Sequence, residues 1–142
     1  MPQDIDVLVS EVGPRDGLQN IKRIMPTEAK LKWIKSLAAS GLQEIEVGSF
    51  VSHNLLPQMA DCATLVRETK KIGKVTILAL VPNLKGAEKA IAAGARKLTM
   101  PPSASRAHSL NNIGKTPEEA IEEVRRVCVL RDSLPLENRP DV

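Results

Sequence analysis

Aromatic side chains are rare in this sequence: its 142 residues include one Trp, one Phe and no Tyr. Proteins that bind single-stranded nucleic acid stack bases on aromatic rings, so we set that class aside. The 20 Lys and Arg residues outnumber the 17 Asp and Glu residues by only three, and both kinds are scattered along the chain. Such a small surplus predicts neither nucleic acid nor an anionic membrane as the partner.

Cysteine and long apolar segments are scarce as well. Cys62 and Cys128 lie far apart and form no CxxC pair, which argues against a zinc ribbon or a disulfide framework, so we expect reduced, buried thiols. No apolar run approaches the roughly 20 residues that cross a bilayer, and no signal-peptide pattern opens the chain. We therefore expect a cytoplasmic protein without a membrane partner.

Strand-like and helix-like segments alternate along the chain, whose hydrophobic content of 42% is typical of a globular protein. The predicted strands are 7–12, 44–47, 75–80 and 98–100, and the predicted helices are 26–40, 59–69, 84–93 and 117–128. The last helix follows a long polar loop and begins with a capping Thr116, Pro117 and Glu119.

This alternation predicts a parallel sheet, either in a barrel or in an open doubly wound fold. A complete (β/α)8 barrel needs about 250 residues. We therefore predict an α/β fold in which residues 1–142 form about four βα units of a partial TIM barrel, the N-terminal half of a domain. Residues 139–142 are typical of the approach to a fifth strand.

The exit of the first strand is the first place to look for chemistry, because reactive groups in these folds gather where the strands end. Here Arg15 and Asp16 place a fixed cation beside an oxygen ligand, between Gly13 and Gly17. An Asp can hold a hard divalent metal, and an Arg can stabilise an oxyanion. An Arg–Asp turn that only caps the loop remains the alternative.

Glu46 lies inside the second predicted strand, where alternation points it away from the face of Ile45 and Val47. A carboxylate inside a barrel needs a partner, and Arg15 at the neighbouring strand exit is the candidate. We interpret Glu46 as half of a buried ion pair that shapes the site, with proton transfer as the alternative.

His108 follows the fourth strand and would lie at the same rim, where it could contact a substrate. A solvated loop histidine is the alternative, for His108 and for His53 alike. Neither has a second histidine at ligand spacing, so two or more metal ligands would have to come from elsewhere.

Six short motifs follow one another along the chain: Glu11–Asn20 (EVGPRDGLQN), Ile45–Val47, Ser49–Ser52, Pro57–Met59, Val81–Gly86 and Ala92–Ala95. In this order they resemble the motifs of the 3-hydroxy-3-methylglutaryl-CoA (HMG-CoA) lyase family. The resemblance implies a TIM-barrel lyase that cleaves HMG-CoA to acetyl-CoA and acetoacetate with a divalent cation, Mg²⁺ or Mn²⁺. Such a lyase serves leucine catabolism and ketone body formation.

The resemblance also implies roles for four residues. Asp16 would be a metal ligand, and Arg15 would bind substrate and stabilise the enolate oxygen, while Glu46 and Gln19 would complete the catalytic neighbourhood. The predicted contact of His108 with the substrate rests on its position at the rim and not on the resemblance, because residues 100–108 depart from the family. Members of the family take further metal ligands from a His-X-His strand and an Asn, and a catalytic Cys from a loop, all in the second half of the barrel.

Three interpretations follow from the resemblance. The first is a lyase, expected to be a homo-oligomer or to need the missing C-terminal half. The second is a non-catalytic half-barrel that self-associates through exposed strand edges. The third is a related lyase or condensing enzyme for another acyl-CoA or 2-oxo acid, because residues 100–108 depart from the lyases in sequence.

Overall fold

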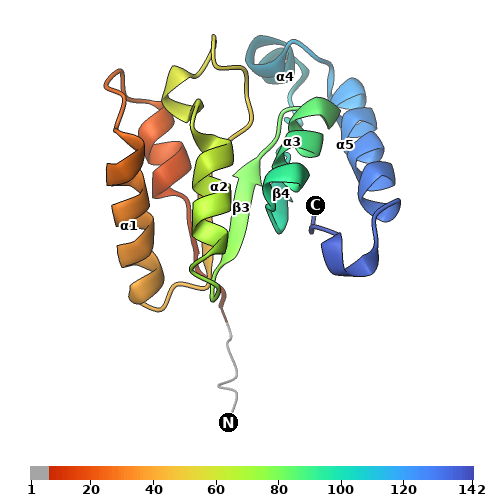
Figure 1. Ribbon diagram of the computed structural model, residues 1–142. Coiled ribbons are helices and arrows are strands. Elements are labelled where there is room, and N and C mark those ends of the chain that lie inside the picture. Colours follow the sequence, from red (N-terminus) through yellow and green to blue (C-terminus); the bar gives the residue numbers. More distant parts are fainter. Residues whose placement is uncertain (1–6) are drawn as a thin grey trace.

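The four strands of the sheet lie in the order in which they occur in the chain, and all are parallel. They are β1 (Ser10–Glu11), β2 (Glu44–Ser49), β3 (Thr76–Leu80) and β4 (Lys97–Thr99) in the computed structural model, which describes residues 7–142 (Figure 1). An open doubly wound sheet reverses its strand order at a switch point, whereas a barrel keeps sequence order. The predicted α/β class and partial barrel are confirmed.

Four helices form a layer against one face of this sheet. Figure 1 shows α1 (Thr27–Ala39), α2 (Cys62–Lys70), α3 (Leu84–Ala93) and α5 (Pro117–Asp132) side by side, and each packs against the next. A shorter helix, α4 (Arg106–Ile113), lies outside this layer, near the end of the sheet at which β4 ends. Three single turns, η1 (Gly13–Gly17), η2 (Pro57–Met59) and η3 (Leu136–Asn138), complete the elements of residues 7–142.

The hydrophobic core lies between the sheet and the helices. Alternate strand residues such as Ile45, Val47 and Ile77 belong to it, together with Ile34 of α1 and Leu65 of α2, and all five are at most 2% exposed. Because side chains alternate along a strand, Glu44 and Glu46 point to the opposite face, as the sequence predicted for Glu46. That face is the inner face of a barrel.

Helix α2 packs directly on the backbone of β2. A Cβ atom added to Gly48 would lie 2.7 Å from Sγ of Cys62, so this position has no room for a side chain. The pairing of β2 with β3 also shifts between Glu46 and Gly48, which marks a β-bulge. The bulge comes directly after Glu46, toward the end of the strand that meets the candidate site.

The first strand is much shorter than predicted. The prediction was 7–12, but β1 contains only Ser10 and Glu11, and Val7, Leu8 and Val9 are 74%, 51% and 60% exposed. The reason is the register of the sheet. Ser10 pairs with Glu44, the first residue of β2, so the residues before Ser10 have no β2 residue opposite them.

Other boundaries also differ from the predictions. Helix α1 begins at Thr27, and Pro26 is its N-cap instead of its first helical residue. Helix α2 begins at Cys62, because Pro57–Met59 form a separate 3₁₀ turn. The capping box that starts α5 is present, with Glu119 N–H donating to Thr116 Oγ1 (3.2 Å) and Thr116 N–H donating to Glu119 Oε2 (2.7 Å).

Helix α4 occupies a segment that was predicted to be a loop. Ser105 caps its start by accepting a hydrogen bond from the N–H of His108, and Gly114, with φ of 66°, ends it. Only Ser109 of its eight residues is buried. The helix therefore lacks the periodic apolar face by which a helix is normally found in a sequence.

The tail of the chain returns to the sheet. Asp141 N–H donates to Arg96 O (2.9 Å) and Leu98 N–H donates to Asp141 O (2.7 Å), which makes a parallel bridge beside β4. The predicted approach of residues 139–142 to a fifth strand position is therefore confirmed. Among residues 7–142, none of the helices combines the length and the apolar character that crossing a bilayer requires.

Candidate active site

The turn η1 carries Arg15 from the end of β1 toward β2. Its backbone winds tightly, with Asp16 N–H donating to Val12 O at 2.8 Å. Gly13 is required at the start of this turn. Its N–H donates to Glu11 Oε1 at 2.6 Å, and an added Cβ would lie 2.8 Å from that oxygen and 3.1 Å from the Trp33 ring.

Arg15 bridges two carboxylates. Its Nε donates to Glu46 Oε2 at 2.7 Å, and its Nη1 donates to Asp16 Oδ1 at 2.9 Å. The Glu46 side chain is 2% exposed and that of Arg15 is 15% exposed, whereas that of Asp16 is 54% exposed. The predicted ion pair between Glu46 and Arg15 is thus present, and Asp16 is the member of the cluster that faces solvent.

The second carboxylate oxygen of Glu46 has no hydrogen-bond partner among residues 7–142. Oε1 is buried and accepts no hydrogen bond from any residue of the described range 7–142. A buried carboxylate oxygen without a donor is costly, and native structures contain few such groups. Glu46 can therefore accept one further hydrogen bond or bind one further ligand on the inner face, next to the Arg15 guanidinium.

Gln19 and His108, the other two predicted site residues, do not join this cluster through any hydrogen bond in the described part of the chain. Gln19 is half-buried, and its carbonyl accepts a hydrogen bond from Gln58 Nε2 at 3.4 Å. His108 is exposed on α4, with Nδ1 2.8 Å from Ser103 Oγ. Their roles remain predictions.

The donor set offers one metal ligand and not a complete site. Asp16 has an exposed carboxylate of the kind that Mg²⁺ and Mn²⁺ prefer. Within residues 7–142, however, no three His, Cys, Asp or Glu side chains lie close enough together to hold a metal ion. Any resident cation would need ligands beyond this group of residues.

Both cysteines are free thiols, as predicted. Cys62 is buried, and burial raises the pKa of its thiol to about 12, so at neutral pH it is not a nucleophile. Cys128 is only half-buried, contrary to the prediction, because it lies toward one edge of the buried face of α5, where Val127 occupies the centre.

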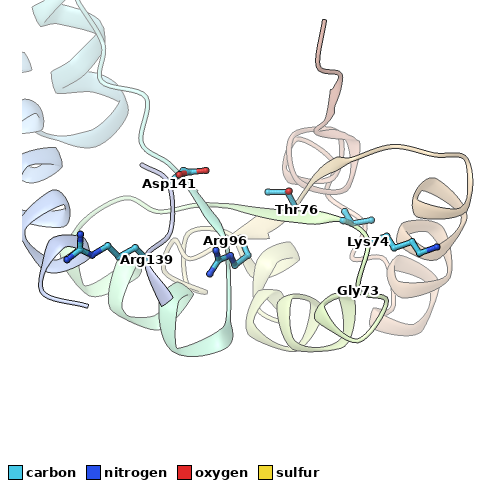
Figure 2. A pocket seen from close by; sticks show the side chains of 7 residues that line it. Gly73, Lys74, Thr76, Arg96, Arg139 and Asp141 are labelled. Carbon is cyan, nitrogen blue, oxygen red and sulfur yellow. The ribbon is translucent and has the colours of Figure 1, made fainter. Parts of the chain in front are cut away.

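Two hollows mark the two ends of the sheet. Figure 2 shows the one at the starts of β3 and β4, of about 380 Å³, where Arg96 and Arg139 lie near Asp141. Arg96 donates to Glu137 O, and Arg139 donates to Asp132 O at the end of α5 and to Leu134 O just after it, so both arginines hold the tail in place. The other hollow, of about 540 Å³, lies between α2 and α3 beside His53, at the end of the sheet that carries Arg15.

A buried lysine near the site was missed in the sequence. Lys30 of α1 is 1% exposed, and its Nζ donates to Asp61 Oδ1 at 2.7 Å and to Gln58 O at 2.5 Å. A signal was available, because Lys30 precedes Ile34 and Leu37 at helical spacing and so lies on the apolar face of α1.

Comparison with known proteins places the chain in a family. The sequence model of the HMGL-like family matches residues 6–134. The chain belongs to the HMGL-like family. Among its curated relatives, the mitochondrial hydroxymethylglutaryl-CoA lyase of Gallus gallus is 43% identical over 126 residues. The cytoplasmic 3-hydroxy-3-methylglutaryl-CoA lyase of Mus musculus is 44% identical over 121 residues.

The fold of this HMGL-like chain also matches solved structures. An HMG-CoA lyase from Acinetobacter baumannii, in complex with coenzyme A and 3-methylmalate, superposes with a TM-score of 0.84 at 32% identity and covers 94% of the chain. The chain spans 42% of that structure, 42% of the chicken relative and 35% of the mouse relative. It therefore corresponds to less than half of each protein.

Proposed function

We propose that the protein containing this chain is a carbon–carbon lyase that cleaves HMG-CoA to acetyl-CoA and acetoacetate. The supporting observation is the Arg15 guanidinium, fixed by the buried Glu46 at the end of β1, in a chain of the HMGL-like family. The complex of the related lyase with coenzyme A supports an acyl-CoA substrate. This reaction would place the protein in leucine catabolism and ketone body formation.

The reaction needs a group that stabilises negative charge on the thioester oxygen. When the hydroxyl on C3 loses its proton, the C2–C3 bond breaks, and its electron pair forms the enolate of acetyl-CoA while C3 becomes the ketone of acetoacetate. A proton returned to C2 then completes acetyl-CoA. Arg15 supplies a fixed positive charge and N–H donors for the enolate oxygen.

Glu46 would act through Arg15. Its Oε2 accepts from Arg15 Nε, which leaves the other guanidinium nitrogens to face the substrate and Asp16. Oε1, which has no partner in the described residues 7–142, could accept a hydrogen bond from a substrate hydroxyl. Gln19 and His108 would line the same rim, Gln19 beside the reacting centre and His108 toward the acyl-CoA.

A divalent cation, Mg²⁺ or Mn²⁺, would be held by Asp16 together with ligands outside residues 7–142, and would polarise the substrate oxygens. We further propose that the working enzyme needs the second half of the barrel, as a continuous chain or as a separate one, and that it is a homo-oligomer. We place it in the cytoplasm, although the names of its relatives include mitochondrial as well as cytoplasmic forms.

A coupled assay for acetoacetate release from HMG-CoA, with Mg²⁺ or Mn²⁺, tests the proposal. The full protein should turn over, and both Arg15→Met and Asp16→Ala should lower kcat/KM by about 10²-fold or more. Arg23→Met, an exposed arginine in the loop that follows, is the matched control. Turnover that is unchanged in both site variants would refute these assignments.

The substrate panel should include the CoA thioester of 3-methylmalate, because the acid itself lies with coenzyme A in the related lyase. Preference for that thioester would favour a related lyase over HMG-CoA cleavage.

A further inference from the structure

The motif Pro57–Met59 has no role in the chemistry described above, yet it contacts the loop that follows Asp16. Gln58, in the middle of η2, extends its side-chain amide toward that loop. Its Nε2 donates to Ile21 O at 2.7 Å and, more weakly, to Gln19 O at 3.4 Å. These bonds join positions that are 37 and 39 residues apart in the sequence.

Leu18, which is 5% exposed, anchors the start of the loop, but the residues after it have little other support. Residues 20–24 are all exposed, and no helix or strand forms between Gln19 and Thr27. Within the described residues, the other hydrogen bonds of this stretch are local, from Asn20 Nδ2 to Asp16 O at 3.1 Å and from Ile21 N–H to Leu18 O at 3.4 Å. Among residues 7–142, Gln58 is thus its one connection to another element through side-chain hydrogen bonds.

Gln58 is itself held by a buried ion pair. Lys30 Nζ donates to the backbone carbonyl of Gln58 at 2.5 Å and to Asp61 Oδ1 at 2.7 Å. Thr27 Oγ1 donates to the other oxygen of this carboxylate, Asp61 Oδ2, at 2.8 Å. A buried cation is tolerated only with such partners, and removing one of them is costly. The start of α1, the turn η2 and the approach to α2 are therefore tied together at one point.

We propose that Gln58 is a positioning residue, which fixes the loop Leu18–Ile21 against the Lys30–Asp61 pair and so places Gln19 beside Arg15 and Asp16. The effect on catalysis rests on the lyase function proposed above, whereas the effect on the loop does not. The role explains why Pro57–Met59 belongs with the site motifs although none of its side chains reaches the reacting groups.

Two substitutions test the role in the full protein. Gln58→Met keeps the size of the side chain and removes the donor. Gln58→Glu places a carboxylate against the two loop carbonyls, so it should be the more severe of the two. Gln43→Glu, at an exposed glutamine outside this network, is the matched control.

Hydrogen exchange followed by mass spectrometry is the first measurement. In Gln58→Glu, peptides covering residues 17–25 should exchange about 10-fold faster or more, while peptides from α3 and α5 should exchange as in the wild type. Gln58→Met should show a smaller increase in the same peptides. Unchanged exchange at residues 17–25, or a uniform increase over the whole domain, would overturn the proposal.

Kinetics give the second measurement. If the lyase function holds, Gln58→Glu should lower kcat about 10-fold or more and change KM less, because a misplaced loop disturbs the reacting centre more than the tail of the substrate. A variant that loosens the loop and keeps wild-type kcat would refute the catalytic part of the role. If the wild type shows no lyase activity, the proposed function fails and the exchange experiment still decides whether Gln58 holds the loop.

Discussion

Glu44 and Glu46 lie two residues apart on the same face of β2, and each is paired with a cation from another element. Glu44 uses both of its oxygens. Lys97 Nζ donates to Oε1 at 2.9 Å and to Oε2 at 3.2 Å, and the Ser10 hydroxyl donates to Oε2 as well. Glu46 uses Oε2 for Arg15, and its Oε1 stays buried without a partner in the described residues.

We interpret the difference as one between an ion pair that stabilises the sheet and an ion pair that belongs to the proposed active site. Glu44 joins β1, β2 and β4 near the starts of the strands, where conserved polar contacts of barrels serve stability. Glu46 lies nearer the ends of the strands, where barrels carry their chemistry, and it keeps a bonding site free. A buried carboxylate oxygen without a hydrogen-bond partner therefore indicates a functional site more strongly than an ion pair does by itself.

The largest expected effect is that of Glu46→Gln on activity. The amide can still accept from Arg15, but it no longer fixes the guanidinium by charge, so we expect kcat/KM to fall about 10²-fold. Because removing one charge of a buried pair is costly, the melting temperature should fall as well, so activity is measured at a temperature at which the variant stays folded. Glu44→Gln is the matched control in the same HMG-CoA assay, and an equal loss of activity in both variants would break the comparison.

The comparison of Glu44 with Glu46 requires that α2 packs firmly on β2, because both glutamates must be held by an equally rigid strand. Gly48→Ala should destabilise the protein by about 1–3 kcal/mol, since the new Cβ would overlap Sγ of Cys62. Urea unfolding measures the loss. Cys62→Ala in the same chain should recover more than half of it, and no recovery would mean that α2 does not pack here as described.

Glu44→Gln should have a smaller effect on stability, of about 1 kcal/mol. Lys97 is 38% exposed and can be solvated when its partner is neutral, and the Ser10 hydroxyl can still donate to the amide oxygen. Urea unfolding at neutral pH gives the value. A loss as large as that of Gly48→Ala would show that this end of the sheet depends on the charge itself.

The smallest expected effect is the pH dependence of the stability that the contact of Glu44 with Ser10 and Lys97 contributes. The Ser10 hydroxyl and then Lys97 lower the pKa of Glu44 in the folded protein, against the opposing effect of burial. A lowered pKa favours folding above the ordinary carboxyl value of about 4.3, and this contribution is lost as the pH falls through the lowered pKa. The stability difference between wild type and Glu44→Gln should therefore shrink on acidification. Urea unfolding of the wild type and of Glu44→Gln at about pH 7 and at about pH 3 measures this difference. An equal stability difference at the two pH values would contradict the prediction.

Much of the fold could be predicted because it depends on local pattern. The cap at Thr116 and the apolar face of α3 are encoded within a few residues, and the alternation at Ile45–Val47 correctly placed Glu46 opposite the core. The extent of β1 could not be predicted, because it depends on where β2 begins, 34 residues later. The apolar run at Val7–Val9 therefore gave a strand that was too long.

The candidate site was also predictable only where it depends on the local sequence pattern. The pair of Arg15 and Glu46 followed from neighbouring strand exits and a buried carboxylate in need of a cation. The contact of Gln58 with Ile21 O did not, because a side chain that bonds a carbonyl of a distant loop leaves no periodic signal. Helix α4 was missed because it buries only Ser109, so its sequence shows polarity without periodicity.

The shortness of β1 has a consequence for the order in which the site forms. A ladder of two residues supplies little pairing, and Arg15 finds its charge partner 31 residues further along the chain. During synthesis the segment that carries Arg15 therefore leaves the ribosome well before β2 and cannot be fixed until β2 has folded against α2. Arg15 is in place only after the second βα unit has formed, so assembly of the candidate site follows assembly of the barrel wall.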